Sequence, residues 1–225
     1  MINDIGCNML VSTNQKDIHP DLEKTVRKHF CKQFQKPIQR HNQEAFKKML
    51  DGITGNKPFI FDSCCGVGES TINIAKIYPS HYVVGIDKSK VRINNSKYYV
   101  KRNKHTLKNF IIFRADVVDF WRLAVDAGIK LDHHYLLYPN PWPKKGQLNH
   151  RWHGHPVFPT LLKLGGTLHI RSNWKLYLEE FALAVQIVSD RKCILKEIFP
   201  LEPISSFERK YQIIDEKLFE LVLTT

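Results

Sequence analysis

The sequence lacks three features that would place it in a specialised class of protein. It has no apolar stretch long enough to cross a bilayer, and its first seventeen residues carry acids in place of the apolar block of a secretory signal. Its five cysteines are odd in number and show no CxxC spacing, so neither a disulfide framework nor a paired-cysteine zinc site is indicated. These absences predict a cytoplasmic protein with no membrane partner.

Two nucleotide-binding patterns are also absent. The sequence holds no GK[ST] triplet, and the turn at residues 62–69 lacks the first glycine of a G-x-G-x-x-G fingerprint. A loop that cradles phosphate is therefore not expected. No internal repeat or low-complexity linker occurs, and 225 residues suit one domain, with or without an arm.

Positive charge, in contrast, is abundant. The chain carries 34 lysines and arginines against 22 aspartates and glutamates, a formal net charge of +12. A surface of this sign favours a polyanionic partner, and nucleic acid ranks above membrane because no basic amphipathic anchor is evident. The alternative is a basic surface that is merely well solvated, and charge alone leaves both interpretations open.

The N-terminal segment differs from the rest of the chain. Residues 1–50 are polar and basic and predict a helical arm ahead of a main domain of residues 51–225. Within residues 21–34, apolar side chains recur every four positions, at Leu22, Val26, Phe30 and Phe34. That step indicates one face of a helix, which Pro37 should end. We expect this arm to pack against the main domain.

From residue 57, short apolar strands alternate with helical segments. Strands are predicted at residues 59–61, 82–86, 110–113, 135–138 and 167–171. Helices are predicted at residues 69–78, 90–104, 117–127 and 174–188, and an antiparallel strand pair at residues 193–199 and 218–223. The alternation implies an α/β fold with a doubly wound sheet. Ligands of such sheets bind beyond the carboxyl ends of the strands, so the residues after each strand are the candidates for a site.

Acidic residues follow three consecutive predicted strands, at Asp62, Asp87 and Asp116. Asp62 opens a turn whose Gly66 and Gly68 let the backbone approach a ligand. A carboxylate there suits the cationic amino group of a methionine-type cofactor. Asp87 follows at the spacing of a ribose-binding carboxylate, and Asp116 with the next backbone N–H can read an adenine edge. Each acid alone is more often a helix cap, but the three together indicate a nucleoside cofactor without phosphate.

The fourth strand is followed by a loop with three prolines in five residues, at Pro139, Pro141 and Pro143. These prolines exclude helix and central strand, so the loop should be rigid. It presents Asn140 and Trp142 and then Lys144 and Lys145, a combination suited to base stacking and phosphate contact. The competing interpretation is a stiff connection with Trp142 packed inward.

Taken in order, these motifs resemble one family, the tRNA (guanine-N7-)-methyltransferases of bacterial type, over residues 58–211. The most specific string is Pro-Asn-Pro-Trp-Pro-Lys-Lys at residues 139–145, which is similar to the family's PDPWPKK. Residues 172–177 are similar to TDWxxY, and residues 205–210 resemble TxFExR. The strings FDSCCGVG, GID and RADV stand where the family keeps its cofactor contacts.

The resemblance implies a class I S-adenosylmethionine-dependent methyltransferase that acts on N7 of a guanine in tRNA. Its fold would be Rossmann-like, with a seven-stranded sheet and an antiparallel C-terminal hairpin. Asn140 would be the catalytic position. Cofactor positions would be Asp62, Cys64, Gly66, Gly68, Asp87, Asp116, Val117 and Asn140. Substrate positions would be Lys144, Lys145, Asn173, Ser205 and Glu208. The implied partner is tRNA or another structured RNA, and a monomer is slightly favoured over an oligomer.

Four substitutions depart from the family pattern. Asn140 replaces the acid of PDPW, Asn173 the acid of TDW, Ser205 a threonine, and Cys64 a glycine of the first turn. Guanine N7 carries a lone pair and no proton, so the family's acids would recognise the base, and rate would come mainly from alignment. An amide accepts one hydrogen bond without a carboxylate's charge, which could cost about 1–3 kcal/mol per contact. We therefore expect retained chemistry with weakened or altered base selectivity.

Two other functions stay open. Asn140-Pro141 partly matches the N-P-P-[YFW] motif of methyltransferases that act on exocyclic amines, although the aromatic residue stands one place early. The substituted acids also suit a non-catalytic RNA-binding paralogue. We expect the other reactive side chains, the histidines and cysteines described next, to have structural roles.

No metal site is expected from the sequence. His150, His153 and His155 cluster in one loop, but metal coordination needs converging geometry that an HxxHxH string does not guarantee. The adjacent Cys64 and Cys65 are interpreted as small hydrophobes at a buried turn.

Overall fold

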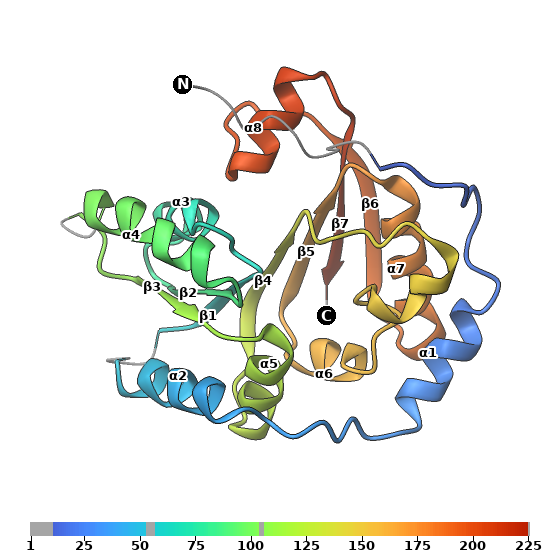
Figure 1. Ribbon diagram of the computed structural model, residues 1–225, viewed down its shortest axis with the longest axis horizontal. Coiled ribbons are helices and arrows are strands. Elements are labelled where there is room, and N and C mark those ends of the chain that lie inside the picture. The colour runs from blue at the N-terminus through green and yellow to red at the C-terminus, as the bar shows by residue number, and fades with distance from the viewer. Residues whose placement is uncertain (1–10, 53–56, 104–105, 225) are drawn as a thin grey trace.

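The computed structural model describes residues 11–52, 57–103 and 106–224. In that part of the chain, seven strands form one sheet of order β3-β2-β1-β4-β5-β7-β6 (Figure 1). The strands are β1 (Phe59–Ser63), β2 (Tyr82–Asp87), β3 (Phe110–Arg114), β4 (Leu131–Leu137), β5 (Thr167–Ser172), β6 (Lys192–Ile198) and β7 (Leu218–Thr224). β1 to β5 run parallel, and β7 is antiparallel to both β5 and β6. The predicted α/β sheet with its antiparallel C-terminal hairpin is confirmed.

Helices connect these strands and form the N-terminal arm. They are α1 (Leu22–Phe30), α2 (Arg40–Asp51), α3 (Glu69–Ile77), α4 (Lys90–Asn103), α5 (Val117–Asp126), α6 (Phe158–Lys163), α7 (Lys175–Val188) and α8 (Ser206–Ile213). A 3-10 helix, η1 (Lys145–His150), follows the proline-rich loop. Periodicity did not predict α6 and α8, because helices of six and eight residues are too short to show a clear apolar stripe. None of the described helices has the length and apolar content needed to cross a membrane.

Alternate residues of the central strands enter two different cores. On β1, Ile60 packs with Ile74 of α3, whereas the ring of Phe61 lies 5.8 Å from that of Phe120 on α5. The two-residue period of a strand sends neighbouring side chains to opposite faces. Figure 1 shows α3 and α4 on one side of the sheet and α5, α6 and α7 on the other. The carboxyl ends of the five parallel strands therefore meet at one edge.

The N-terminal arm shares the core of the sheet. Leu22 and Val26 of α1 are buried, and α1 packs against α6 and α7. Phe46 of α2 packs edge-on against Phe120, with ring centroids 5.1 Å apart. The expectation that the arm packs against the main domain is confirmed, and both of its helices contribute buried apolar surface.

The first helix of the arm is shorter than its periodicity predicts. The predicted helix at residues 21–34 ends at Phe30, and the chain then runs irregularly to residue 39. Phe34 does not continue the helical face, because its ring lies 5.3 Å from the Arg122 guanidinium and 5.6 Å from the ring of His155. These contacts with α5 and with the loop before α6 take the place of a fourth helical turn.

Candidate active site

The turn after β1 is tightly wound. Cys64, Gly66 and Gly68 have φ values of 64°, 60° and 78°, the left-handed region that favours glycine. A Cβ at Gly68 would lie 2.3 Å from Ile112 Cδ1, so that side chain would have to shift, and the positive φ would strain any other residue. Cys64 holds this conformation with a side chain, at a position where the resemblance expects glycine. Burial raises the pKa of its thiol to about 12, so the thiol stays protonated.

Asp62 is a buried carboxylate with one unpaired oxygen. Its Oδ2 accepts hydrogen bonds of 2.6 Å from both Ser70 Oγ and Thr71 Oγ1 at the start of α3. Its Oδ1 is buried and has no hydrogen-bond partner among the described residues. Burial raises the pKa of Asp62 to about 6. A bound ammonium group would satisfy Oδ1 and stabilise the ionised form, so the residue suits the amino group of a methionine-derived cofactor.

Asp87 and Asp116 lie at the ends of β2 and β3, next to this turn. Asp87 Oδ2 accepts from the backbone N–H of Gly66 at 3.0 Å, and its Oδ1 accepts from that of Ser89 at 2.8 Å. Asp116 caps α5 by accepting from the backbone N–H of Val118 at 2.9 Å. The structure thus places the three predicted acids at three adjacent strand ends. Val117, the next cofactor position, is buried at the start of α5.

The proline-rich loop is held in shape by its own asparagine. Asn140 Oδ1 accepts from the backbone N–H of Trp142 at 3.2 Å. Both Tyr138 and Trp142 have positive φ, 51° and 47°, so the loop reverses sharply at both ends of the Pro-Asn-Pro string. The Trp142 ring packs on His150 at 4.8 Å. The Asn140 side chain is exposed, as are Lys144 and Lys145 beyond it.

The N-terminal arm and Arg151 bind this loop through its backbone carbonyls. Thr13 Oγ1 donates to the carbonyl of Pro143 at 2.7 Å. His19 accepts from a backbone N–H at Nδ1, so its Nε2 carries the proton and donates to the carbonyl of Lys145 at 3.1 Å. Arg151 Nε donates to the carbonyl of Trp142 at 3.1 Å. These three hydrogen bonds position the backbone of the loop.

A buried ion pair anchors the same network. Arg151 and Glu180 are both fully buried and pair directly. Glu180 Oε1 also accepts from Gln15 Nε2 at 2.6 Å and from the His19 backbone N–H at 2.8 Å. Burial alone would raise the pKa of Glu180, but its hydrogen bond from His153 and the charges of His153 and Arg151 lower it to about 2. The carboxylate is therefore charged at neutral pH and joins the arm to α7.

Sequence reasoning missed Arg151 and Glu180. The guanidinium of Arg151 also lies 5.0 Å from the ring of Trp174, so the pair touches the segment at residues 172–177. One signal was available: Glu180 is an acid within the apolar face of the helix predicted at residues 174–188, where a charge needs a buried partner.

The predicted substrate positions near the C-terminus form a second polar network. Ser205 caps α8, because its Oγ accepts from the Glu208 backbone N–H at 3.2 Å. Glu208 is fully buried, and its Oε1 accepts from Arg171 Nη1 at 2.8 Å and from the Tyr138 hydroxyl at 3.1 Å. Tyr138 immediately precedes the proline-rich loop. Ser205 and Glu208 therefore lie where they can position that loop, whatever they contact in a complex.

α8 also reaches back to the first turn. Arg209 pairs with Glu69 at the start of α3, and Asn73 Nδ2 donates to the carbonyl of Ile204 at 3.2 Å. Asn173, at the end of β5, donates from Nδ2 to Glu216 Oε1 at 3.3 Å. The structure thus gathers the first turn, the proline-rich loop and both C-terminal motifs along one edge of the sheet.

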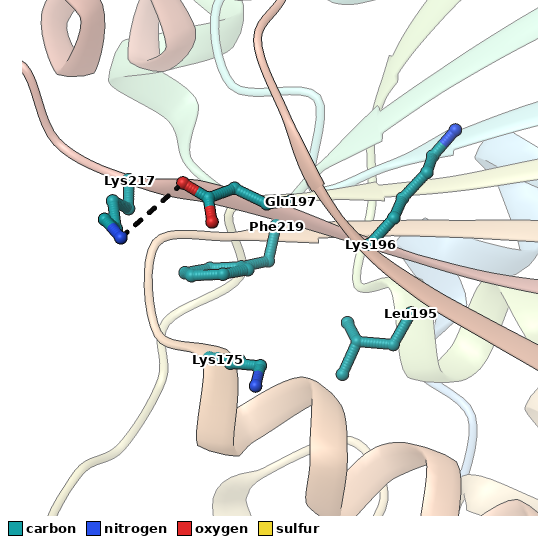
Figure 2. Close-up of a pocket in the computed structure, with 6 residues that line it drawn as sticks. All are labelled: Lys175, Leu195, Lys196, Glu197, Lys217 and Phe219. Carbon is teal, nitrogen blue, oxygen red and sulfur yellow. Dashed lines mark ion pairs between the residues drawn. The ribbon is translucent and has the colours of Figure 1, made fainter.

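A groove of about 380 Å³ continues this edge beyond β5. Figure 2 shows the residues that line it, which are Lys175, Leu195, Lys196, Glu197, Lys217 and Phe219. Each lysine makes one ion pair of 3.2–3.8 Å with a glutamate, yet more than half of each lysine side chain is exposed. The groove combines cationic groups with an aromatic floor, and it begins two residues after Asn173.

The three histidines of the HxxHxH string diverge. His150 packs on Trp142, and His153 is buried with its Nε2 3.1 Å from Glu180 Oε2. His155 lies between Phe34 and Trp152. Each ring thus has a separate structural contact.

Comparison with known proteins agrees with this arrangement. Residues 56–221 match the family model described as "Putative methyltransferase". A tRNA (guanine-N(7)-)-methyltransferase of Stutzerimonas stutzeri is 26% identical over 185 residues, which cover 76% of this chain and 75% of the relative.

Two solved structures are similar in fold. An antibiotic-related methyltransferase aligns with a TM-score of 0.56 and 15% identity, covering 80% of this chain and 94% of the other. A 16S rRNA (adenine(1408)-N(1))-methyltransferase from Catenulisporales acidiphilia, solved with S-adenosylmethionine, aligns with a TM-score of 0.51 and 15% identity, covering 79% and 90%. The chain therefore belongs to this methyltransferase family and is a divergent relative of the tRNA (guanine-N7-)-methyltransferases.

Proposed function

We propose that this enzyme methylates N7 of a guanine in tRNA. The observation that carries the proposal is the placement of the loop at residues 139–145 beside the first turn, at the edge that also holds residues 172–177 and 205–210. These are the motifs in which the chain resembles the tRNA (guanine-N7-)-methyltransferases, and the relative quoted above carries that name.

For methyl transfer to guanine N7, the protein needs mainly to align the reacting groups. When bound, S-adenosylmethionine supplies a methyl group on a positively charged sulfur. Guanine N7 has an in-plane lone pair and no proton to remove, so no side chain need act as a base. In this proposal Asp62 Oδ1 holds the amino group, Asp87 the ribose, and Asp116 with the Val117 N–H the adenine, with Cys64, Gly66 and Gly68 shaping the turn against the cofactor.

Asn140 would then contact the target guanine and the methyl donor together. Its Oδ1 already accepts from the Trp142 N–H, and a carbonyl oxygen has a second lone pair for a guanine N–H. An aspartate would offer a second oxygen and a full charge. We therefore expect methylation with a higher KM for the base than a carboxylate would give.

The exposed lysines would bind the RNA backbone. Lys144 and Lys145 are the last two residues of the proline-rich loop, and Lys175 and Lys217 line the groove. Phosphate contacts of this kind fix register without reading sequence. Asn173 lies two residues before Lys175 at the end of β5, and in this proposal it contacts the target nucleotide.

The test uses the purified protein with methyl-labelled S-adenosylmethionine and unmodified bulk tRNA, followed by digestion and identification of the labelled nucleoside. Appearance of 7-methylguanosine would support the proposal. Another methylated nucleoside would replace it with the exocyclic-amine activity. Cofactor binding with no transfer to any RNA would indicate a binding-only paralogue.

A further inference from the structure

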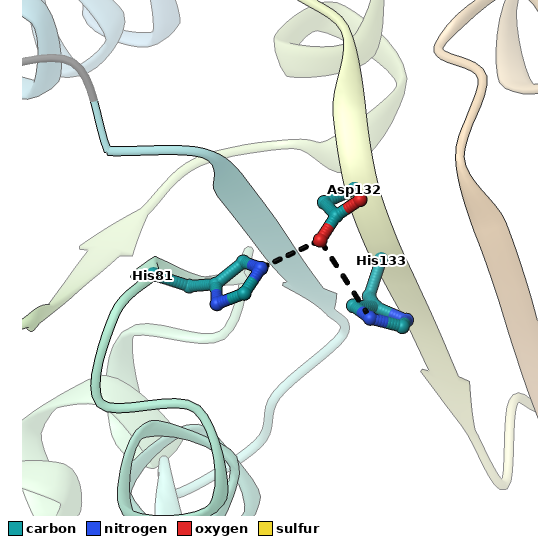
Figure 3. Close-up of side chains that lie close together, drawn as sticks. All are labelled: His81, Asp132 and His133. Carbon is teal, nitrogen blue, oxygen red and sulfur yellow. Dashed lines mark hydrogen bonds and ion pairs between the residues drawn. The ribbon is translucent and has the colours of Figure 1, made fainter.

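A compact group of potential metal ligands lies at the opposite edge of the sheet from the active site. His81 precedes β2, and Asp132 and His133 are the second and third residues of β4. β2 and β4 both pair with β1, so the three residues lie on either side of the amino end of β1. Figure 3 shows both imidazoles directed at the carboxylate of Asp132. Among the described residues, this is the one group of three or more ligand-type side chains whose ligand atoms converge.

The spacing of the ligand atoms suits a small divalent ion. His81 Nε2 lies 2.6 Å and His133 Nε2 3.8 Å from Asp132 Oδ2, and all three atoms are within 4.8 Å of one another. Ligand atoms of a tetrahedral zinc site with bonds of about 2.0–2.2 Å stand roughly 3.3–3.6 Å apart. The side chain of Asp132 is 54% exposed, so a modest rotation can open the shorter distance. A fourth position would face solvent.

Neighbouring groups set the tautomer that metal binding requires. His169 Nδ1 lies 3.9 Å from Glu220 Oε1, which favours a proton on that nitrogen and leaves His169 Nε2 as an acceptor. His133 Nδ1 is 3.2 Å from His169 Nε2 and can donate to it. The lone pair of His133 is then at Nε2, the atom that faces Asp132. Glu220 and His169 therefore favour the tautomer in which His133 Nε2 can bind an ion.

The second imidazole must change its protonation when an ion binds. The 2.6 Å contact with Asp132 Oδ2 requires a proton on His81 Nε2. An ion at Nε2 displaces this proton, and in the other tautomer the N–H at Nδ1 can donate to Ser80 Oγ, 3.1 Å away. The ring of Tyr78 lies 5.3 Å from His81 and 4.7 Å from His133, so it restricts both imidazoles at once. Binding of an ion therefore costs little additional side-chain conformational entropy.

We propose that His81, Asp132 and His133 bind one divalent transition-metal ion of the zinc type, with solvent as the fourth ligand. Two histidines and one carboxylate are a common zinc ligand set. The ion would link the segment before β2 to the start of β4 across β1, and it would lie away from the methyl-transfer edge. The site does not depend on the proposed RNA substrate.

The test is a calorimetric titration of the chelator-treated full-length protein with Zn²⁺, repeated with Co²⁺ to read coordination from its visible absorption. We expect one ion per chain, with a dissociation constant on the order of micromolar. His133→Ala should weaken binding at least about 100-fold, and His169→Gln about tenfold, because an outer hydrogen-bond partner contributes less than a ligand. Asp132→Asn replaces an exposed side chain, so it tests the site without threatening the fold.

His41→Ala is the matched control, since His41 is exposed on α2 and outside the group. Circular dichroism of each variant checks that the fold is intact. Zn²⁺ affinity that is unchanged in His133→Ala and Asp132→Asn would overturn the proposal, as would the absence of stoichiometric binding to the unsubstituted protein.

Discussion

The guanidinium of Arg151 and the carboxylate of Glu180 form an ion pair with no exposed surface on either side chain. The pair connects three parts of the chain that are distant in sequence: the arm through Gln15, the proline-rich loop through the Trp142 carbonyl, and α7, which carries Glu180. The pair therefore joins the arm, the proline-rich loop and α7 in one buried network.

Breaking this pair should destabilise the protein strongly. Glu180→Ala leaves the Arg151 charge buried without its partner, and we expect the free energy of unfolding to fall by about 3–5 kcal/mol. Urea unfolding measures the change. The exposed pair of Arg27 and Glu23 is the matched control, since Glu23→Ala should cost no more than about 1 kcal/mol. Equal effects of the two substitutions would contradict the role given to the buried pair.

Cofactor affinity should depend on the ionisation of Asp62. Burial raises the pKa of this carboxyl to about 6, so below that pH it is mostly neutral and loses its attraction for an ammonium group. We expect the affinity for S-adenosylmethionine to fall as the pH is lowered from 7.5 to about 5, by roughly tenfold per pH unit below the pKa of the group. Asp62→Asn should bind weakly at every pH in calorimetric titration. A variant that keeps the wild-type pH profile would exclude Asp62 as the titrating group.

His134 should make the fold sensitive to acid. Burial lowers the pKa of His134 from 6.5 to about 3, and the hydroxyl of Ser63, which accepts from Trp121, donates to its neutral Nε2. The unfolded chain takes up this proton at higher pH than the folded one. The stability contribution is therefore complete above pH 6.5 and is lost as the pH falls towards 3, on the order of 4 kcal/mol.

The measurement compares the free energy of unfolding of His134→Gln with that of the unsubstituted protein across this pH window. Gln can accept the Ser63 hydrogen bond but does not titrate, so the difference between the two proteins should shrink with falling pH. A difference that stays constant between pH 6.5 and 4 would show that another group is responsible.

Restoring the family's acids should strengthen guanine methylation, provided that Glu216 is neutralised. Asn173 donates to Glu216, so an aspartate at 173 would face a like charge. We expect Asn140→Asp with Asn173→Asp and Glu216→Gln to raise kcat/KM for 7-methylguanosine formation roughly ten- to hundredfold. Asn149→Asp adds a charge to η1 outside the motif and is the control. Unchanged kcat/KM in the triple variant would sink the idea that these positions read the base.

The groove lysines should contribute to RNA affinity through phosphates. Replacing Lys175 and Lys217 by alanine removes two cationic groups, and the slope of log K against log salt should fall by about 0.7–0.9 for each lost contact. Lys47→Ala on α2 is the control on a different surface. Filter binding with unmodified tRNA over a range of salt concentrations gives the slopes. Slopes identical to the unsubstituted protein would place the RNA elsewhere.

The architecture was largely predictable, because it depends on local patterns. Alternation of apolar strands with helices predicts a parallel sheet, and the positions of Asp62, Asp87 and Asp116 then follow from the rule that strand ends meet. The ends of individual elements were less predictable. Residue 34 fits the helical period of α1, yet the contact of Phe34 with Arg122 removes it from the helix.

The apolar setting of Glu180 signalled a buried partner, but the pairings within the polar networks could not be predicted, because their members are far apart in sequence. Glu180 is 165 residues from Gln15, and His81 is 51 residues from Asp132. Sequence motifs identify metal ligands only when these lie close together, within one loop or helix. The HxxHxH string has such a spacing, but its three rings make three separate contacts. The sequence also carried no indication that Glu208 accepts a hydrogen bond from the Tyr138 hydroxyl.

Among the described residues, the arm binds the proline-rich loop through the carbonyls of Pro143 and Lys145, and Arg151 binds it through the carbonyl of Trp142. These hydrogen bonds therefore do not depend on which side chains the loop carries. Mutation can exchange the residues that meet the substrate while the backbone stays in place, so substrate preference can drift without loss of the fold. Asn140, which stands where the resembled family has an acid, is a difference of this kind, and its Oδ1 accepts from the Trp142 N–H.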